Sequence, residues 1–365
     1  MKIGIINFHC AHNYGAMLQA YALQEELIKE GHTAIIIDFQ PDSIIESYKL
    51  WSVKKFFHPR RLVGTIKNYR KLKPKYEVFE NFKKENMNLT KNIYKSINEN
   101  VINKEKFDAF VCGSDQVWNM DLNGGLTEYL LSFAPQESKK IAYAASIGTK
   151  FIKDKYVDIM KKELDTFDSI SVREDDAVNI MKETFNLEAT HVLDPVFLLS
   201  KKEWKDIAIK LKKKKEKYVL LYGLEENELF EKTFKFIKDN TDMKIINISP
   251  AKKVSEYIDE TIYSVGPREF IGLLEEAELV FTNSFHGTCF SIIFGKKFFT
   301  IGHSELNSRL ESILRLTNLE SHMINKEFQS LDEFYNTIDI ESEKVNEILD
   351  KEIRKSKEFL VQALK

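Results

Sequence analysis

Residues 3–39 read IGIINFHCAHNYGAMLQAYALQEELIKEGHTAIIIDF, and this stretch predicts the fold class. The apolar, largely β-branched run Ile3–Phe8 predicts a strand, and a polar loop follows up to Gly15. Apolar residues then recur at helical spacing over Met17–Ile28, and Ala34–Phe39 forms a second apolar strand. A strand–helix–strand unit with continuously apolar strands is typical of a parallel sheet that is covered on both faces.

The same alternation continues along the chain and predicts two domains. Further strands are predicted at 107–112, 141–146, 169–172, 217–222, 244–248, 278–282 and 297–301, and helices at 44–88, 152–165, 174–184, 226–239, 267–275, 285–294 and 339–362. We therefore expect an α/β protein of two doubly wound Rossmann-like domains facing a cleft. The predicted divisions are an N-terminal domain at 1–198, a C-terminal domain at 199–335, and a C-terminal helix at 336–365 that packs back on the N-terminal domain.

Length and composition support a globular protein of this size. The chain has 365 residues, 43% of them hydrophobic and 30% charged, and single domains usually span about 100–200 residues. The net charge of −2 offers no overall positive field for nucleic acid. The apolar run at the N-terminus is too short for a signal peptide, and no run approaches the roughly 18 apolar residues of a membrane span.

The cysteines bear on the compartment and on metal binding. Cys10, Cys112 and Cys289 are odd in number, far apart and in no CxxC spacing, so free thiols fit better than disulfides or a zinc site. No His, Asp or Glu cluster has metal-ligand spacing such as HExxH either. We expect a cytoplasmic protein without a metal ion.

In open α/β sheets, ligands bind outside the carboxyl ends of the strands, so the residues that follow each predicted strand are candidate site residues. Asn13 and Gly15 follow the first strand, where a glycine lets backbone amides approach an anion; a turn with an asparagine cap explains them equally well. Asp115, Gln116 and Trp118 follow the strand at 107–112. They form a plausible sugar-binding loop with an aromatic stacking face, although capping explains part of the pattern.

The strongest junction follows the strand at 278–282. There Asn283-Ser284-Phe285-His286-Gly287 opens a predicted helix. A histidine at a helix N-terminus is a candidate for proton transfer near neutral pH, and the N–H groups around it favour a phosphate or carboxylate. Taken alone, a histidine that caps the helix or packs in the interior accounts for the pattern as well.

Two arginines stand at comparable places. Arg173 follows the strand at 169–172, and Arg309 opens a helix. The planar guanidinium suits carboxylates and phosphates. Pairing with a neighbouring acidic residue on the surface is the alternative for both.

One basic segment suggests a membrane contact. Lys54–Tyr76 contains nine Lys and Arg residues and no Asp or Glu, interleaved with apolar residues. A basic amphipathic helix of this kind can lie on an anionic membrane surface, here the inner face of the membrane. A solvated helix covering one domain is the alternative.

Taken together, these motifs resemble the polysaccharide pyruvyl transferase family over about residues 1–320. The resemblance rests on the order and spacing of five motifs: Asn13-Tyr14-Gly15-Ala16 with Leu18-Gln19-Ala20-Tyr21-Ala22-Leu23, Gly113-Ser114-Asp115-Gln116-Val117-Trp118-Asn119, Ser171-Val172-Arg173-Glu174, Val192-Leu193-Asp194-Pro195 and Ser284-Phe285-His286-Gly287.

This resemblance implies a fold like that of GT-B glycosyltransferases and an enzyme that transfers pyruvate from phosphoenolpyruvate, as a co-substrate and with no cofactor, onto a sugar as a ketal. It implies that His286 is the catalytic acid or base and that Arg173 binds the donor. Several relatives carry an arginine at the position of Ser284, so the donor's charge must be met elsewhere, and Arg309 is the candidate. Ser284 and Gly287 complete the predicted donor side. The predicted acceptor side consists of Asn13, Gly15, Asp115, Gln116 and Trp118.

The expected acceptor is a cell-surface polysaccharide precursor, with a lipid-linked saccharide as one form of it. Two rival functions remain at this point. One is a nucleotide-sugar-dependent glycosyltransferase with the same fold, and the other is a saccharide-binding protein without activity. Binding of phosphoenolpyruvate discriminates the prediction from both.

Overall fold

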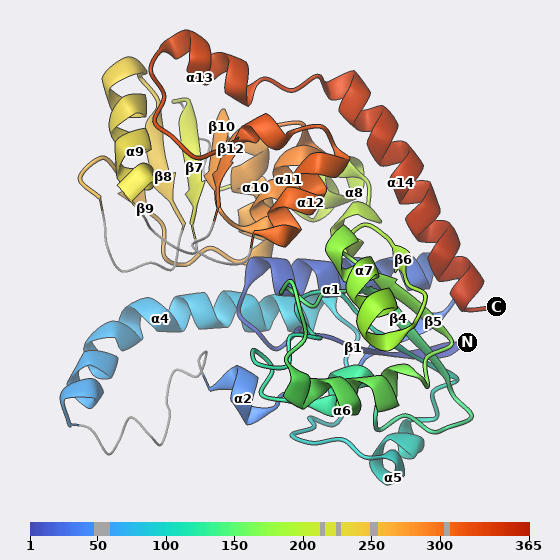
Figure 1. Ribbon diagram of the computed structural model, residues 1–365. Helices are drawn as coiled ribbons and strands as arrows, with labels where there is room; N and C mark the ends of the chain where they lie inside the picture. Colours follow the sequence, from blue (N-terminus) through green and yellow to red (C-terminus); the bar gives the residue numbers. More distant parts are fainter. Residues whose placement is uncertain (47–58, 212–215, 224–227, 249–254, 303–306) are drawn as a thin grey trace. The chain divides into compact units, whose positions relative to one another are not determined.

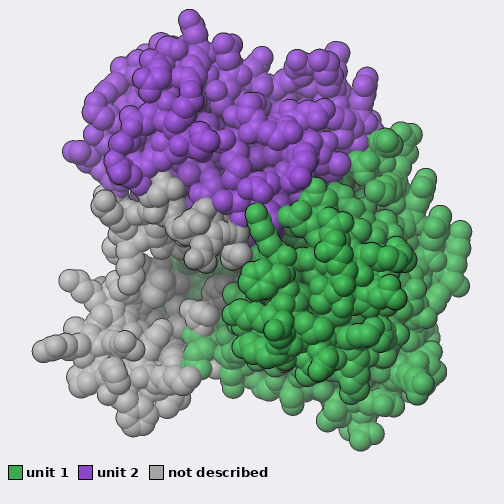
Figure 2. Space-filling view, in the orientation of Figure 1, with its two compact units in different colours: residues 1–199, 351–365 green, residues 200–350 purple. Residues whose placement is uncertain are grey.

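The computed structural model describes residues 1–46, 59–211, 216–223, 228–248, 255–302 and 307–365, with side chains described throughout these ranges except at 59–72. The chain divides into two compact units (Figure 2). Unit 1 comprises residues 1–199 and 351–365, and unit 2 comprises residues 200–350. Each unit is built around its own parallel sheet, as the alternation of strands and helices predicts.

The sheet of unit 1 has the strand order β2-β1-β3-β4-β5-β6, and all its pairings are parallel. The chain passes from β1 to β2 on one side and then crosses to β3 on the other, so β1 and β3 flank the topological switch point. Ligands of doubly wound sheets bind at such points. Figure 1 labels β1, β4, β5 and β6 of this sheet. The strands are β1 (Lys2–Ile6), β2 (Thr33–Ile36), β3 (Ala109–Cys112), β4 (Lys139–Ala145), β5 (Ser169–Val172) and β6 (Thr190–His191).

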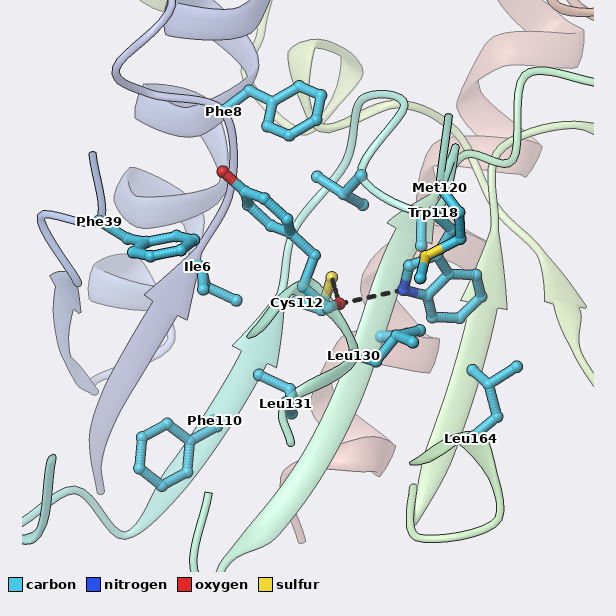
Figure 3. Packing of buried hydrophobic residues seen from close by; sticks show 14 of the residues in the cluster. Ile6, Phe8, Phe39, Phe110, Cys112, Trp118, Met120, Leu130, Leu131 and Leu164 are labelled. Atoms are coloured by element: carbon cyan, nitrogen blue, oxygen red, sulfur yellow. Dashed lines mark hydrogen bonds between the residues drawn. The ribbon is translucent and has the colours of Figure 1, made fainter. Parts of the chain in front are cut away.

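Helices cover this sheet and close an apolar core. The helix α1 (Tyr14–Lys29) starts at the Asn13 cap, three residues before the predicted apolar periodicity, and is buried along most of its length. The core contains Ile6, Phe110 and Trp118, together with Leu164 from the end of α6 (Figure 3). The other helices of unit 1 are α2 (Asp42–Ile45), α4 (Pro59–Asn86), α5 (Glu99–Ile102), α6 (Asp154–Leu164) and α7 (Asp175–Phe185), with short 3₁₀ turns at Asn103–Glu105, Thr127–Leu130 and Pro195–Phe197.

The basic segment Lys54–Tyr76 falls largely outside the described side chains. Its backbone is helical from Pro59 onward, as part of α4. Residues 54–58 and the side chains of 59–72 are not described, so contact with a membrane stays a prediction. In the described part of the chain, no helix combines the length and apolarity needed to cross a bilayer.

Unit 2 repeats the design. Its parallel sheet has the order β12-β11-β10-β7-β8-β9, and its switch point lies between β7 and β10. Its strands are β7 (Tyr218–Tyr222), β8 (Lys244–Asn247), β9 (Glu260–Thr261), β10 (Leu279–Thr282), β11 (Lys297–Ile301) and β12 (Met323–Ile324). Its helices are α8 (Lys201–Ile207), α9 (Glu228–Asn240), α10 (Pro267–Glu276), α11 (Phe285–Phe294), α12 (Ser308–Leu316) and α13 (Leu331–Ile338), with a 3₁₀ turn at Glu320–His322.

The sequence missed the shortest strands and predicted the long elements well. The strands β6, β9 and β12 have two residues each and lie at sheet edges, where so short a segment shows no periodicity. The division between units falls between Leu199 and Ser200. The last helix, α14 (Ser342–Ala363), begins in unit 2 and ends in unit 1, so residues 336–350 group with unit 2.

Candidate functional site

In unit 2, the switch point carries the turn between β10 and α11. Ser284 is the N-cap of α11, and its Oγ accepts from the Gly287 N–H at 3.4 Å. Thr282 Oγ1 accepts from the Ser284 N–H at 3.0 Å and donates to the Tyr222 carbonyl at 2.6 Å. These bonds tie the end of β10 to β7 and fix where the helix begins, so Ser284 has a structural role of its own.

Gly287 and His286 occupy the first turn of α11. An added Cβ on Gly287 would overlap Thr282 Oγ1, so the glycine is required by the close approach of the helix to the strand. His286 is 5% exposed, and its ring contacts Phe285 edge to face with centroids 5.1 Å apart. The predicted histidine thus stands at a helix N-terminus on a switch point, where an anion is favoured.

Arg309 lies in the same unit. It stands in the first turn of α12, is half-buried, and α12 packs against α11. The structure therefore brings the helix of the predicted cation into contact with the helix of His286.

In unit 1, the loop after β1 places Asn13 and Gly15 at the other switch point. Asn13 Oδ1 accepts from the Ala16 N–H at 3.2 Å, which is the N-cap bond of α1. Gly15 is buried in the first turn of that helix. Their capping role is evident, and binding of an acceptor by them stays a prediction.

Asp115 and Gln116 lie on the loop after β3, at the same switch point. Both are half-buried, and Asp115 Oδ1 accepts from the Gln116 N–H at 2.8 Å. The Gln116 side chain lies against Gly148 in the loop after β4, where an added Cβ would overlap Gln116 Oε1. The loops after β3 and β4 are thus packed together at the carboxyl edge of the sheet.

Trp118 is a core residue and offers no stacking face. It is 0% exposed, and its indole N–H donates to the Tyr129 carbonyl at 3.1 Å (Figure 3). Its ring also meets Phe167 edge to face. The predicted sugar-stacking role is wrong for this conformation, because an apolar indole stabilises the domain most when both of its faces are buried.

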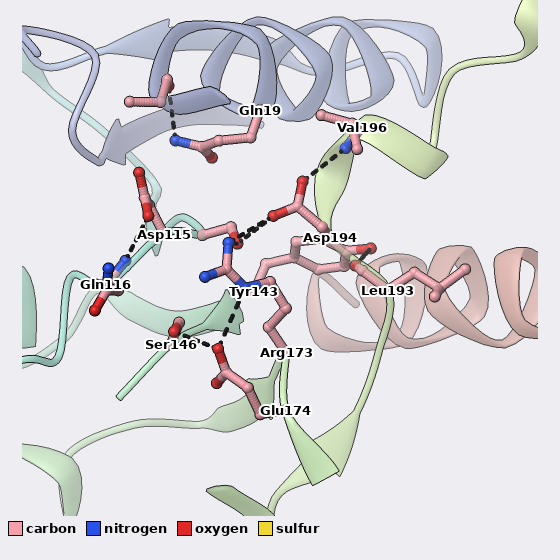
Figure 4. Close-up of polar contacts among 12 residues, drawn as sticks. Gln19, Asp115, Gln116, Tyr143, Ser146, Arg173, Glu174, Leu193, Asp194 and Val196 are labelled. Atoms are coloured by element: carbon pink, nitrogen blue, oxygen red, sulfur yellow. Dashed lines mark hydrogen bonds and ion pairs between the residues drawn. The ribbon is translucent and has the colours of Figure 1, made fainter. Parts of the chain in front are cut away.

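Arg173 lies in a buried ion-pair network (Figure 4). It is 4% exposed, its Nη1 lies 2.9 Å from Asp194 Oδ2, and its Nε lies 3.4 Å from Glu174 Oε1. Burial alone would lower the pKa of the guanidinium, but the charges of Glu174 and Asp194 outweigh it and raise the pKa. The carboxylates hold Nε and Nη1, so Arg173 braces this network, and the predicted contact with the donor stays a prediction.

The network joins residues that the sequence did not single out as site residues. Ser114 Oγ donates to Asp194 Oδ2 at 2.9 Å, and Ser146 Oγ donates to Glu174 Oε1. Asp194 and Glu174 belong to two of the five motifs. Their position after strands was the one sequence feature that could have marked them as site residues. The sequence does not reveal that these two motifs meet at Arg173, because β5 and β6 become neighbours only in the sheet.

A second buried pair at this edge was also missed. His9 Nε2 lies 3.1 Å from Asp38 Oδ1, and Gln40 donates to the same oxygen at 2.7 Å. Burial would raise the pKa of Asp38, but the bonds and charges of His9, Gln40 and Lys83 lower it overall. His9 is fully buried, so the pair lies beneath the surface of the switch point.

Comparison with known proteins identifies the family. The model of the polysaccharide pyruvyl transferase family matches residues 13–305, which is most of the chain. This chain belongs to the polysaccharide pyruvyl transferase family. It is therefore an enzyme, a transferase of polysaccharide biosynthesis, and a saccharide acceptor is consistent with the family.

Solved structures agree on the fold. A Listeria monocytogenes protein described as a UDP-N-acetylglucosamine 2-epimerase matches with a TM-score of 0.53 at 12% identity, over 99% of this chain and 91% of that chain. The Neisseria meningitidis UDP-GlcNAc 2-epimerase bound to UDP-GlcNAc matches with a TM-score of 0.50 at 10% identity, over 100% and 99%. At such identities the likeness concerns the fold alone, and it confirms two Rossmann-like, GT-B-like domains. Compared with curated proteins, the chain has no significant match.

Proposed function

We propose that this pyruvyl transferase moves pyruvate from phosphoenolpyruvate onto a sugar of a cell-surface polysaccharide precursor as a ketal. The observation that carries the proposal is the start of α11 at the switch point of unit 2, with His286 in its first turn. Phosphoenolpyruvate is a trianion, and a helix N-terminus favours phosphate and carboxylate groups.

The buried residues of unit 2 support the placement of an anionic donor there. The described part of unit 2 buries no Asp, Glu, Lys or Arg side chain. Within the described part of unit 2, a trianion bound near α11 would therefore meet no buried carboxylate that would repel it. Arg309, on the helix packed against α11, is the proposed cation for the donor, and it takes the part of the arginine that relatives carry at the position of Ser284.

The proposed reaction balances without a cofactor or a metal ion. The methylene carbon of phosphoenolpyruvate takes up one proton and becomes a methyl group, and the C2–oxygen bond to phosphate breaks. The oxygens of two sugar hydroxyls each form a bond to C2. One of the two hydroxyl protons accounts for the methyl group, and the other leaves with the phosphate. His286 is the proposed acid that delivers the methyl proton.

The test uses phosphoenolpyruvate with a panel of nitrophenyl glycosides. We expect phosphate release that depends on a glycoside, together with the mass gain of one pyruvyl group, and both should survive treatment with EDTA. His286→Asn should lower the rate by about 10²–10⁴-fold while the protein stays folded. The half-exposed His32→Gln is the matched control and should keep the wild-type rate.

Calorimetric titrations separate the rival functions. Binding of UDP-sugars without binding of phosphoenolpyruvate would replace this proposal with a glycosyltransferase. Glycoside binding without turnover of either donor would indicate a saccharide-binding protein. Wild-type turnover by His286→Asn would remove the histidine from the mechanism and leave the function standing.

A lipid-linked acceptor at the inner membrane surface is the finer part of the proposal. It is supported only by the composition of Lys54–Tyr76. Flotation with vesicles containing anionic lipid should show salt-sensitive binding, and neutral vesicles should show none. Equal recovery with both vesicle types would contradict the membrane contact.

A further inference from the structure

Asp115 has an unusual backbone at a functional position. Its φ is +78°, in the left-handed region that side chains rarely adopt, and it is half-buried directly after β3. Such a conformation costs on the order of 1 kcal/mol or more and persists only where the surroundings hold it. Because β3 flanks the switch point, this strained carboxylate lies at the edge where doubly wound sheets bind ligands.

The neighbouring strand is shaped to hold this residue. The Asp115 carbonyl accepts from the Ser146 N–H at 3.0 Å, just beyond the end of β4. Inside β4, Ala144 has a φ of +52° where the register with β5 shifts. Where this pairing is interrupted, the Ser171 side chain replaces the missing backbone hydrogen bonds. Its Oγ accepts from the Ala144 N–H at 3.1 Å and donates to the Ala142 carbonyl at 2.9 Å. A bulge next to a site commonly re-aims the strand end.

The buried network then clamps both sides of Asp115. Ser114, the preceding residue, is bonded to Asp194, and Ser146 is bonded to Glu174. Both carboxylates pair with the single guanidinium of Arg173 (Figure 4). Arg173 therefore holds the two hydroxyl-bearing residues that fix the position of the Asp115 backbone.

Two buried polar atoms, on Asn7 and Gln19, have no hydrogen-bond partner that the structure describes. Asn7 Nδ2 lies 3.4 Å from the place of a Cβ on Gly113, two residues before Asp115. This donor and the acceptor Gln19 Oε1 are buried without a hydrogen-bond partner among the described residues. Buried polar atoms in native proteins normally have partners, and a hydroxyl group, which donates and accepts, complements both.

We propose that Asp115 is the general base that takes the proton from the acceptor sugar's hydroxyl, and that Arg173 is its positioning residue. This proposal rests on the proposed function. As the hydroxyl oxygen forms its bond to C2, the O–H bond breaks and the proton passes to the Asp115 carboxylate. The carboxylate releases it to solvent, from which the spent acid is reprotonated, so the proton balance is kept. His9 at the same switch point is fully buried, whereas Asp115 is half-exposed.

The experiment compares three variants with phosphoenolpyruvate and the nitrophenyl glycosides. Asp115→Asn keeps the tolerance for a left-handed backbone and the acceptor oxygen for the Gln116 N–H, but removes the base. We expect its kcat to fall about 10²–10⁴-fold, with an unchanged unfolding midpoint and unchanged affinity for phosphoenolpyruvate. Asp121→Asn, on the same loop but exposed, is the matched control and should keep the wild-type rate.

Chemical rescue distinguishes a base from a merely structural residue. Asp115→Gly adopts a positive φ without strain and leaves room for a small acid. Added formate should restore part of its rate in a saturable manner, and it should leave Asp115→Asn unchanged. Wild-type turnover by Asp115→Asn, or absence of rescue in a folded Asp115→Gly, would overturn the assignment. If the wild type neither binds phosphoenolpyruvate nor transfers pyruvate, the proposed function fails, and the base assignment fails with it.

Discussion

The two units bury different kinds of polar residues, although their sheets are built alike. Unit 1 buries side chains that are charged at neutral pH: Glu26, Asp38, Lys83, Lys140, Arg173, Glu174 and Asp194. The described residues of unit 2 bury neutral groups instead, such as Thr282, Ser284, Thr288, Thr300 and His322. Ion pairs between buried groups, such as Arg173 with Asp194, occur in unit 1, and none occurs among the residues of unit 2 that the structure describes.

The buried charges of unit 1 stabilise its structure, whereas the switch point of unit 2 has no such buried charge among its described residues. In unit 1, Arg173 lies two strands away from the switch point and is already matched by carboxylates, so its charge stabilises the loops around Asp115. In unit 2, the switch point holds a histidine at a helix N-terminus and no buried carboxylate among the residues described there. This contrast is the basis for proposing the anionic donor in unit 2 and the acceptor hydroxyl in unit 1.

The largest expected effect comes from breaking the ion-pair network. Arg173→Met leaves Asp194 and Glu174 buried without their countercharge, which should lower the free energy of unfolding by about 3–5 kcal/mol. Urea denaturation followed by fluorescence measures this loss. The exposed Arg354→Met should change stability by less than about 0.5 kcal/mol.

A second variant distinguishes the bracing role of Arg173 from donor binding. Arg173→Lys keeps the positive charge but not the geometry that reaches both carboxylates. We expect a lower rate of transfer and unchanged affinity for phosphoenolpyruvate in the folded protein. A selective loss of donor affinity would instead show that Arg173 contacts the donor and would remove the contrast between the units.

A smaller loss of stability should follow from protonating His322, which is buried in unit 2. His322 is 2% exposed and packs on Phe298, and burial lowers its pKa to about 4 from 6.5. Since the pKa of His322 is lower in the folded protein, the unfolded chain binds the proton first as the pH falls. The contribution of neutral His322 to the free energy of unfolding is therefore complete above pH 6.5. It is lost as the pH falls toward 4, in total roughly 3 kcal/mol.

The comparison between the wild type and His322→Gln isolates this contribution. Unfolding free energies measured at pH 7.5, 5.5 and 4 should converge between the two proteins as the pH falls, because glutamine does not titrate. The carboxylates of unit 1 change the unfolding free energy of both proteins equally with pH, so their contribution cancels in the difference. Parallel pH profiles would show that His322 does not carry this acid sensitivity.

The smallest effect concerns the cap of α11. Ser284→Ala removes the bond to the Gly287 N–H and should cost about 1 kcal/mol of stability. Ser284→Asp keeps a capping oxygen but adds negative charge where the donor is proposed to bind. It should stay as stable as the wild type and weaken phosphoenolpyruvate binding roughly tenfold, since like charges 4 Å apart repel by about 1 kcal/mol even in water. Unchanged affinity would place the donor elsewhere.

The fold was largely predictable because periodicity is a local property. The predicted bounds of β5, α11 and β11 agree with the structure, and those of most other long elements differ by a few residues. The exception is the helix predicted at 44–88, where the structure has α2 at Asp42–Ile45 and α4 at Pro59–Asn86. The site was predictable in part. His286 stands where the sequence placed it, at a helix start after a strand, because that junction is also local. Trp118 was misjudged, because its spacing does not reveal which of its faces are covered.

The sequence by itself determined the alternation of strands and helices, the capped starts of α1 and α11, and the family, since each depends on neighbouring residues or on the order of motifs. Tertiary structure alone decided the surroundings of Arg173 and Asp115. The partners of Arg173 are settled by which strands become neighbours, and the carbonyl of the strained Asp115 backbone accepts from the Ser146 N–H, just beyond β4. The physical reason is that burial and pairing between distant segments, which no local pattern encodes, leave Arg173 inside the unit and Asp115 half-exposed.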